Sequence, residues 1–233
     1  MSNRKRGRRR RSRRISNRSG LIRCAAVISG AAVFIIIVCV FVSLIWRGKK
    51  RGDERQVLPQ ITMQAKLLEP NEYSRPQISL KKVKGIVVHY TANPGTDAMD
   101  NRNYFNNLPK INKGKKKPVY ASSHFVIGLT GQIIQCIPLE EIAYASNERN
   151  YDTISIECCH PDESGEFTEA TYKSMVRLCA WLCLKFDLSQ EDVIRHYDVT
   201  GKNCPKHFVE NEKAWEGFRE DIKKAIETAG DAA

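Results

Sequence analysis

An uncharged run of 23 residues, from Cys24 to Trp46, most constrains what this chain can fold into. As a helix rising about 1.5 Å per residue, the run would be about 35 Å long, which is enough to cross a hydrocarbon layer of about 30 Å. A helix on the surface of a globular domain carries polar residues along one face, and this run has no charged residue at all. A cleavable signal peptide is the alternative, but its apolar region is usually only about 7 to 15 residues long. The run therefore predicts a single retained transmembrane helix over residues 24–46.

Basic residues are concentrated before this run, in a tail formed by residues 1–23. The tail holds 11 of the 38 lysines and arginines and no acidic residue, so the rest of the chain is almost neutral, with 27 basic and 26 acidic residues. The positive-inside rule places such an N-terminus in the cytoplasm and the part after the helix outside the cell. A basic segment beside a membrane binds anionic lipid headgroups. This interpretation explains the charge of the tail without a nucleic-acid partner.

Two further parts follow the predicted helix, a stalk over residues 47–80 and a globular domain over residues 81–228. The charges of the stalk and its spaced prolines argue against a packed element, although Val57 to Leu68 fits a short amphipathic helix. A flexible segment of this length reaches roughly 30 Å, so the domain is expected to stay near the membrane. The domain has an ordinary length for one folding unit, and we expect it to be a monomer.

The domain alternates between strand-like and helix-like patterns. Apolar runs predict strands at 84–89, 153–159 and 193–194, and a turn at Thr130-Gly131 predicts a hairpin between 123–129 and 132–137. A helix is expected after the turn at residues 93–96, another from Thr168, and a closing helix near the C-terminus. In the last two helices, apolar residues at i, i+3 and i+4 form a stripe that faces the core. The fold class predicted is α/β, with a mixed central sheet flanked by helices.

Three side chains of this domain have the chemistry of a metal site: His89, His196 and Cys204. His89 ends an apolar strand, and the other two lie eight residues apart far downstream. Two imidazoles and one thiolate suit Zn²⁺, and three protein ligands leave a fourth position open, as in catalytic zinc sites. Taken singly, His89 is better explained as a core histidine and Cys204 as an ordinary buried thiol. Together with Lys202, they predict a zinc centre.

A carboxylate and a lysine complete the candidate site. Glu157 lies inside the apolar run Ile154 to Cys159, where a carboxylate is costly unless it is paired or used. Burial raises the pKa of a carboxyl group, which suits a general base. An ion pair with Arg195 or Lys202 is the alternative. Lys202 precedes Cys204 by two residues, so its charge is expected near the metal, where it can stabilise an oxyanion.

Four segments resemble one known family: 87–91 (VVHYT), 122–127 (SSHFVI), 155–158 (SIEC) and 196–205 (HYDVTGKNCP). They are similar to the zinc-dependent N-acetylmuramoyl-L-alanine amidases of the type 2 amidase family, which includes phage lysozymes and animal peptidoglycan-recognition proteins. The resemblance covers roughly residues 70 to 226, and the spacing of the second histidine, the lysine and the cysteine is its most specific part. It implies a cell-wall hydrolase that acts on peptidoglycan and cuts the bond between N-acetylmuramic acid and the L-alanine of the stem peptide.

The same resemblance assigns roles to residues of the site. It implies that Glu157 is the catalytic acid and base and that Lys202 stabilises the oxyanion. For His124 it leaves two interpretations, a place in the substrate groove or beside the oxyanion, and a structural hydrogen bond. The phage enzymes use a tyrosine before that histidine, and this chain has Ser123 there instead.

Two other functions remain open on the sequence alone, a zinc peptidoglycan endopeptidase and a non-catalytic peptidoglycan-binding receptor. Loss of a metal ligand would favour the receptor, and the full ligand set is present. If Cys204 binds zinc, five cysteines remain beyond the apolar run, so they cannot all pair in disulfides. Cys179 and Cys183, one helical turn apart, are expected to be core residues. His160 and His207 are expected at the surface.

Overall fold

The computed structural model describes Val38 and residues 61–231. The basic tail, the stalk before residue 61 and all of the apolar run except Val38 lie outside the described residues, so the predictions about them stay predictions. Within the described part, no helix combines the length and apolar character that a membrane crossing needs.

A sheet of six strands forms the centre of the domain, in the order β1-β4-β3-β5-β2-β6. Its strands are β1 (Gln64–Ala65), β2 (Gly85–Tyr90), β3 (Phe125–Ile127), β4 (Ile133–Gln135), β5 (Thr153–Cys158) and β6 (Val193–Arg195). Only β3 and β4 pair antiparallel, and every other neighbouring pair is parallel. The predicted hairpin and the mixed sheet are therefore confirmed, and Gly131 takes the positive φ of +81° that its turn requires.

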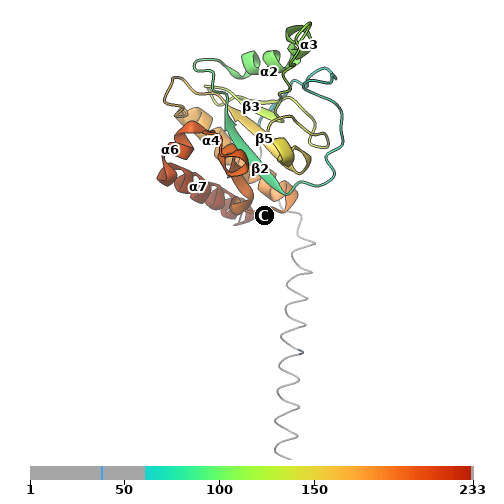
Figure 1. The fold of residues 1–233 in the computed structure, drawn as a ribbon. Helices are drawn as coiled ribbons and strands as arrows, with labels where there is room; N and C mark the ends of the chain where they lie inside the picture. The colour runs from blue at the N-terminus through green and yellow to red at the C-terminus, as the bar shows by residue number, and fades with distance from the viewer. Residues whose placement is uncertain (1–37, 39–60, 232–233) are drawn as a thin grey trace, which may run out of the picture. The chain divides into compact units, whose positions relative to one another are not determined.

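One face of the sheet packs against the long helices α4 (Glu169–Phe186) and α7 (Glu212–Asp231). Figure 1 shows both helices on the same side of β2 and β5, together with the short helix α6 (Lys206–Glu210). Thr168 caps α4, because its side chain accepts a hydrogen bond from the amide of Thr171. The core of this layer contains side chains from the predicted stripes, among them Met175, Leu178, Leu182, Trp215, Phe218 and Ile222.

The other face of the sheet is only partly covered. Helix α2 (Ala98–Asn106) and the four-residue α3 (Leu108–Ile111) follow the loop after β2, and α2 packs near β3 and β4. A second, smaller core lies there, with Phe105 of α2 in the same cluster as Val126 and Ile134 of the sheet. This cover leaves the ends of β2 and β5 accessible on the same face.

Short helical segments connect the remaining strands: η1 (Asn147–Tyr151) before β5, η2 (Gln190–Asp192) before β6, and α5 (His196–Thr200) directly after β6. The six cysteines of the described domain are all buried and free. Cys179 and Cys183 lie in the core under α4, as expected.

Residues 61–80 correct the predicted boundary of the domain. We expected them to belong to a stalk, but β1 joins the edge of the sheet, and Leu68 and Leu80 are buried in its two cores. The segment is fixed further by the side chain of Arg75, which forms a two-pronged ion pair with Glu141. The possible helix from Val57 to Leu68 is absent over its described part, because backbone hydrogen bonds join Lys66 and Leu68 to the β4 region instead. The packed domain thus includes residues from at least 61 onward.

Candidate metal and active site

His89 lies near the end of β2, on the sheet face opposite α4 and α7. Its ring is 1% exposed, and its Nε2 atom lies 3.1 Å from the hydroxyl of Ser146. Its other ring nitrogen, Nδ1, faces His196 and Cys204. Burial, assisted by the nearby charges of His196 and Lys202, lowers the pKa of His89 well below its ordinary value. The ring is therefore neutral at pH 7, which is the form that binds a metal.

A single turn of chain places His196 and Cys204 beside His89. His196 begins α5 immediately after β6, and β6 pairs with β2. Gly201, with a φ of +74°, ends α5 and reverses the chain. The amide of Tyr197 then donates a 2.9 Å hydrogen bond to the carbonyl of Cys204. The eight-residue spacing noted in the sequence is thus the length of one short helix and its return.

The distances within this group fit a metal ion. His89 Nδ1 lies 3.1 Å from His196 Nδ1 and 3.8 Å from Cys204 Sγ, and the ligand atoms all lie within 4.8 Å of one another. A tetrahedral zinc with ordinary bond lengths separates two nitrogen ligands by about 3.3 Å and a nitrogen from a sulfur by about 3.6 Å. Burial is the main reason that the pKa of the Cys204 thiol is raised to about 12, so the thiolate requires a cation beside it. These three residues form a possible metal site.

Glu157 lies beside the three ligands because of strand register. In the parallel pair of β2 and β5, Glu157 is the direct partner of His89, so both side chains project from the same face. Glu157 Oε1 lies 4.0 Å from His89 Nδ1, and Oε2 is buried without a hydrogen-bond partner among the described residues. Burial raises the pKa of this carboxyl to about 8, and the charge of Lys202 opposes the shift. Arg195 does not pair with it, since the guanidinium binds Asp198 and Glu212.

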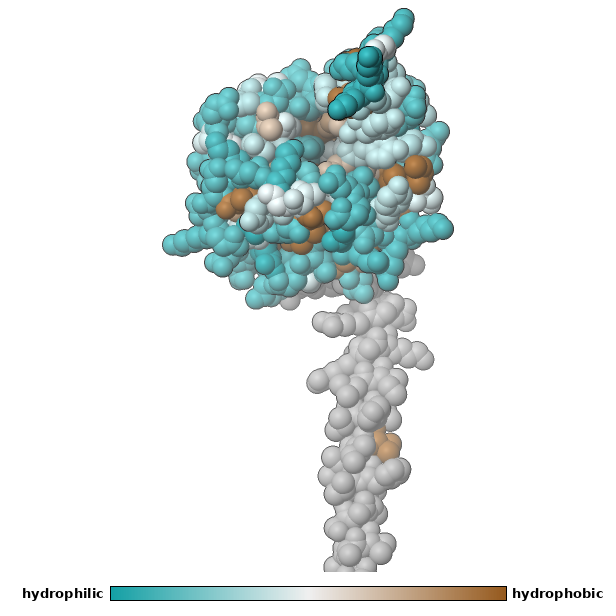
Figure 2. All heavy atoms as spheres, in the orientation of Figure 1, coloured by the Kyte–Doolittle hydropathy of each residue, from teal (hydrophilic) through white to brown (hydrophobic). Residues whose placement is uncertain are grey.

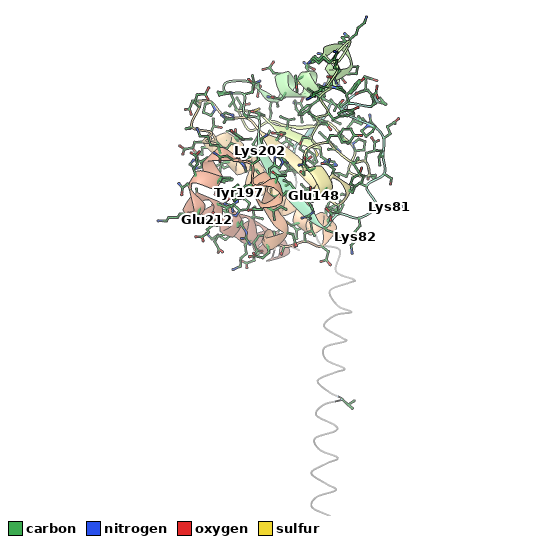
Figure 3. All side chains as sticks on the ribbon, viewed as in Figure 1. Lys81, Lys82, Glu148, Tyr197, Lys202 and Glu212 are labelled. Carbon is green, nitrogen blue, oxygen red and sulfur yellow. The ribbon has the colours of Figure 1, made fainter. Side chains whose placement is uncertain are left out.

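A cavity of about 360 Å³ opens over this group. His89, His196, Cys204, Glu157 and Lys202 all contribute to its wall. Figure 3 shows Lys202 above the strands and well apart from Lys81 and Lys82. The other polar and aromatic wall residues include Tyr90, Thr91, Tyr120, Tyr144, Asn147 and Asn150. The cavity thus places a carboxylate, an ammonium group and a possible metal site around one space that a substrate can enter.

His124 is the one predicted site residue that the structure does not bring to this cavity. Its Nδ1 accepts a hydrogen bond from the amide of Ser155 (3.0 Å), so the proton is on Nε2, which donates to the carbonyl of Glu141 (2.9 Å). Burial lowers the pKa of His124 to about 4, so the ring is neutral. Of the two interpretations of this residue, the geometry supports the structural hydrogen bond.

Two further placements differ from the sequence analysis or were missed by it. His160, expected at the surface, is 1% exposed; its Nδ1 binds the carbonyl of Asp162, and its ring lies 5.0 Å from that of Tyr90. Ser146, which contacts His89, was not identified, because a serine before a turn carries no local signal for such a contact. The fold also reveals Thr91 in the cavity wall, with a buried hydroxyl that has no hydrogen-bond partner among the described residues.

Comparison with known proteins identifies the family. The sequence model of the Amidase_2 family, described as N-acetylmuramoyl-L-alanine amidase, matches residues 79–207, more than half of the chain. The chain belongs to this family. The expected type 2 amidase resemblance is thereby confirmed, and the Amidase_2 match includes every residue of the candidate site.

Curated relatives of this Amidase_2 chain come from bacilli. N-acetylmuramoyl-L-alanine amidase BlyA of Bacillus subtilis is 34% identical over 174 residues, which are 66% of this chain and 44% of the relative. N-acetylmuramoyl-L-alanine amidase CwlL of Bacillus licheniformis is 34% identical over 168 residues, 67% of this chain and 45% of the relative. The chain therefore spans less than half the length of these relatives.

Solved structures agree with the fold. The structure of PlyL is 26% identical in sequence and superposes with a TM-score of 0.59. The match covers 71% of this chain and 99% of the PlyL chain. The solution structure of the PlyG catalytic domain is also 26% identical, has a TM-score of 0.58, and covers 71% of this chain and 96% of its own. The described domain thus corresponds to almost the whole of each of these smaller proteins.

Proposed function

We propose that this protein hydrolyses peptidoglycan at the amide bond between N-acetylmuramic acid and the L-alanine of the stem peptide, with zinc held by His89, His196 and Cys204. The observation that carries this proposal is the meeting of the three ligand atoms within 4.8 Å at the wall of a cavity that also contains Glu157 and Lys202. The proposal is supported by the amidases among the relatives, each named for that bond.

Zinc in a site with an open position lowers the pKa of water from about 15.7 to about 7 and polarises a carbonyl oxygen. Glu157 is positioned to manage the proton of the attacking water, because its carboxylate faces the ligands and Oε2 has no hydrogen bond to another described residue. A cation held by the three ligands would add to the charge of Lys202 and favour the ionised form of Glu157. That carboxylate accepts the proton as the water oxygen adds to the carbonyl carbon. It then returns the proton to the nitrogen of L-alanine as the carbon–nitrogen bond breaks.

Lys202 supplies a positive charge at the mouth of the same cavity. Its side chain is exposed and has no acidic partner among the described residues. Negative charge develops on the carbonyl oxygen during attack, and an ammonium group held close to it lowers the energy of that state. The charge of Lys202 also lowers the pKa values of His89, His196 and Glu157, which supports a place beside the ligands.

We also propose that the domain acts outside the cell, attached to the membrane by one helix over residues 24–46. The support is in the sequence: an uncharged run of 23 residues follows a tail with 11 basic residues. The orientation follows from that charge asymmetry. Peptidoglycan is then on the same side of the membrane as the domain.

The test is product analysis. Muropeptides of known composition are incubated with the full-length protein after removal of metal with a chelator, and again after addition of zinc. We expect free stem peptides that begin with L-alanine only in the zinc-loaded sample, and mass spectrometry identifies them. A Cys204→Ser variant, carried through both treatments, serves as the matched control for zinc added to a site that lacks one ligand.

The alternatives give different results in the same experiment. Cleavage within the stem peptide would identify an endopeptidase. Binding of muropeptides without any release, with zinc bound at one equivalent, would identify a receptor. Either result would refute the amidase proposal.

A further inference from the structure

A cluster of lysines lies at the end of α3 and in the loop that follows it, and it has no part in the proposed chemistry. From Asn101 to Leu139 the chain contains no acidic residue. Within this stretch, five lysines fall in eight positions: Lys110, Lys113, Lys115, Lys116 and Lys117. All five are exposed, and none forms an ion pair with another described residue. The segment thus carries a positive charge that its own domain does not compensate.

The loop that carries four of these charges, residues 113–118, is held at both ends by one buried side chain. Asn112 is 4% exposed. Its Nδ2 donates to the carbonyl of Val119 (2.8 Å), and its Oδ1 accepts from the amide of Val119 (2.9 Å). The backbone of Asn112 also accepts from the amide of Lys115 (2.9 Å). We call residues 113–118 the lysine loop; its fixed ends reduce the entropy that a bound ligand would otherwise have to remove.

The lysine loop stands next to the cavity. Phe105 before it and Tyr120 after it both line the cavity wall. The ring of Tyr120 lies 5.4 Å from that of Tyr73 and 5.7 Å from that of Tyr144, so the end of the loop is joined to an aromatic rim. Figure 1 shows the segment after α3 extending away from the sheet, and Figure 2 shows a hydrophilic projection there above a hollow in the surface. A polymer that leaves the cavity past Tyr120 meets the lysines.

We propose that the lysine loop binds a linear polymer of phosphate groups at the edge of the substrate cavity, so this inference rests on the proposed function. The loop contains lysine and no arginine. Lysine is a compact point charge with three donors that turn freely and is a common ligand of phosphate, whereas the planar fork of arginine favours paired contacts of fixed geometry to carboxylate or phosphate. The loop projects and has no cavity of its own, so a repeated charge along a chain fits it better than a small anion. Several weak contacts to such a chain add up to useful affinity.

The experiment uses full-length protein and inorganic polyphosphate as the probe. Lysines are acetylated briefly with an amine reagent, and mass spectrometry gives the rate at each position. At polyphosphate about ten times its Kd, acetylation of Lys115 and Lys116 should slow by about tenfold. Lys81 and Lys82, an exposed adjacent pair far from Lys202 in Figure 3, should change little. Poly-L-glutamate of equal charge should protect neither pair.

Variants matched in charge complete the test. Because the basic tail of residues 1–23 also attracts phosphate, affinity is read at the loop itself, from the protection of Lys113 and Lys117. By this measure, Lys115→Gln/Lys116→Gln should weaken polyphosphate binding by about 2- to 30-fold, the effect of two exposed charge contacts. Lys81→Gln/Lys82→Gln removes the same charge and should change it less than twofold. Equal losses in both pairs, or equal protection by poly-L-glutamate, would overturn the proposal. If the loop is needed for binding to phosphatidylglycerol vesicles but not to polyphosphate, its ligand is a lipid surface and the polymer proposal is also overturned.

Release of stem peptides from soluble muropeptides separates this inference from the proposed function. Both lysine pairs lie outside the cavity wall, so both variants should release peptides at the parental rate. If the parent releases none, the proposed function fails, while protection of the loop by polyphosphate is still measured. If release is normal and protection is absent, the lysine-loop inference alone fails.

Discussion

Replacement of Ser146 by alanine tests whether the contact behind His89 supports the metal site. Metal binding at Nδ1 of His89 leaves the proton on Nε2, which donates to the Ser146 hydroxyl 3.1 Å away. This hydrogen bond fixes the tautomer and the orientation of the ring. Ser146 is 1% exposed and follows the wall residue Ala145, so water does not replace the lost hydroxyl without rearrangement.

The expected size follows from the geometry. Partners that orient a metal-binding histidine contribute about 10- to 100-fold to metal affinity, which corresponds to about 1.4 to 2.7 kcal/mol at 25 °C. The contact is a neutral hydrogen bond of ordinary length, and the ring is also held by its position in β2. We therefore expect Ser146→Ala to weaken zinc binding by roughly tenfold, the lower end of that range.

Competition with a chromophoric chelator measures this affinity directly. Ser123→Ala is the matched control, because Ser123 is also a buried serine, and its hydroxyl binds the carbonyls of Phe125 and Ser155 instead of a ligand. The control should lose some stability but keep parental zinc affinity. Equal zinc affinity of Ser146→Ala and the parent would refute the reasoning, since the ring would then be oriented without this hydrogen bond.

Three other predictions concern the base, the structural histidine and the orientation in the membrane. Glu157→Gln keeps the side-chain shape and should keep zinc. It should release stem peptide about 10²- to 10⁴-fold more slowly, because the amide cannot accept the proton. Release at the parental rate in single-turnover assays would mean that another residue is the base. His124→Ala removes the partner of one buried backbone amide and of one partly buried carbonyl. It should therefore lower the free energy of unfolding by about 2 to 4 kcal/mol, while zinc content stays near one equivalent. Denaturant titration and metal analysis measure both, and an unchanged midpoint would contradict the structural role. A tag after Ala233 should be removed by protease added to intact cells, and its protection until lysis would reverse the proposed orientation.

The metal ligands could be predicted from sequence because their spacing is set by short local structure. His89 lies near the end of a short apolar run that is typical of a buried strand, and the turn of α5 fixes the distance from His196 to Cys204. Glu157 could be identified from the sequence for a related reason, because a charged residue inside an apolar strand needs an explanation. In each case, nearby residues in the chain carry the signal.

The rest depended on contacts between distant segments, which no local pattern records. His160 looks like a surface residue, but it lies in the loop after β5 and is covered by Tyr90 of β2. Residues 61–80 look like a linker because of their prolines and charges, yet their backbone completes the edge of the sheet. From the sequence alone, His124 cannot be distinguished from a histidine of the active site. Only its hydrogen bonds with Ser155 of β5 and with the carbonyl of Glu141 reveal a structural role.

The register that pairs His89 with Glu157 also limits which changes of chain length this domain tolerates. Neighbouring residues of β5 alternate between the α4 face and the cavity face, so deletion of one residue within the strand would place Ile156 or Cys158 opposite His89. It would also turn the carboxylate into the core. Insertions and deletions near β2 and β5 should therefore be accepted in the connecting loops, or in steps of two residues, and otherwise stop folding and catalysis together.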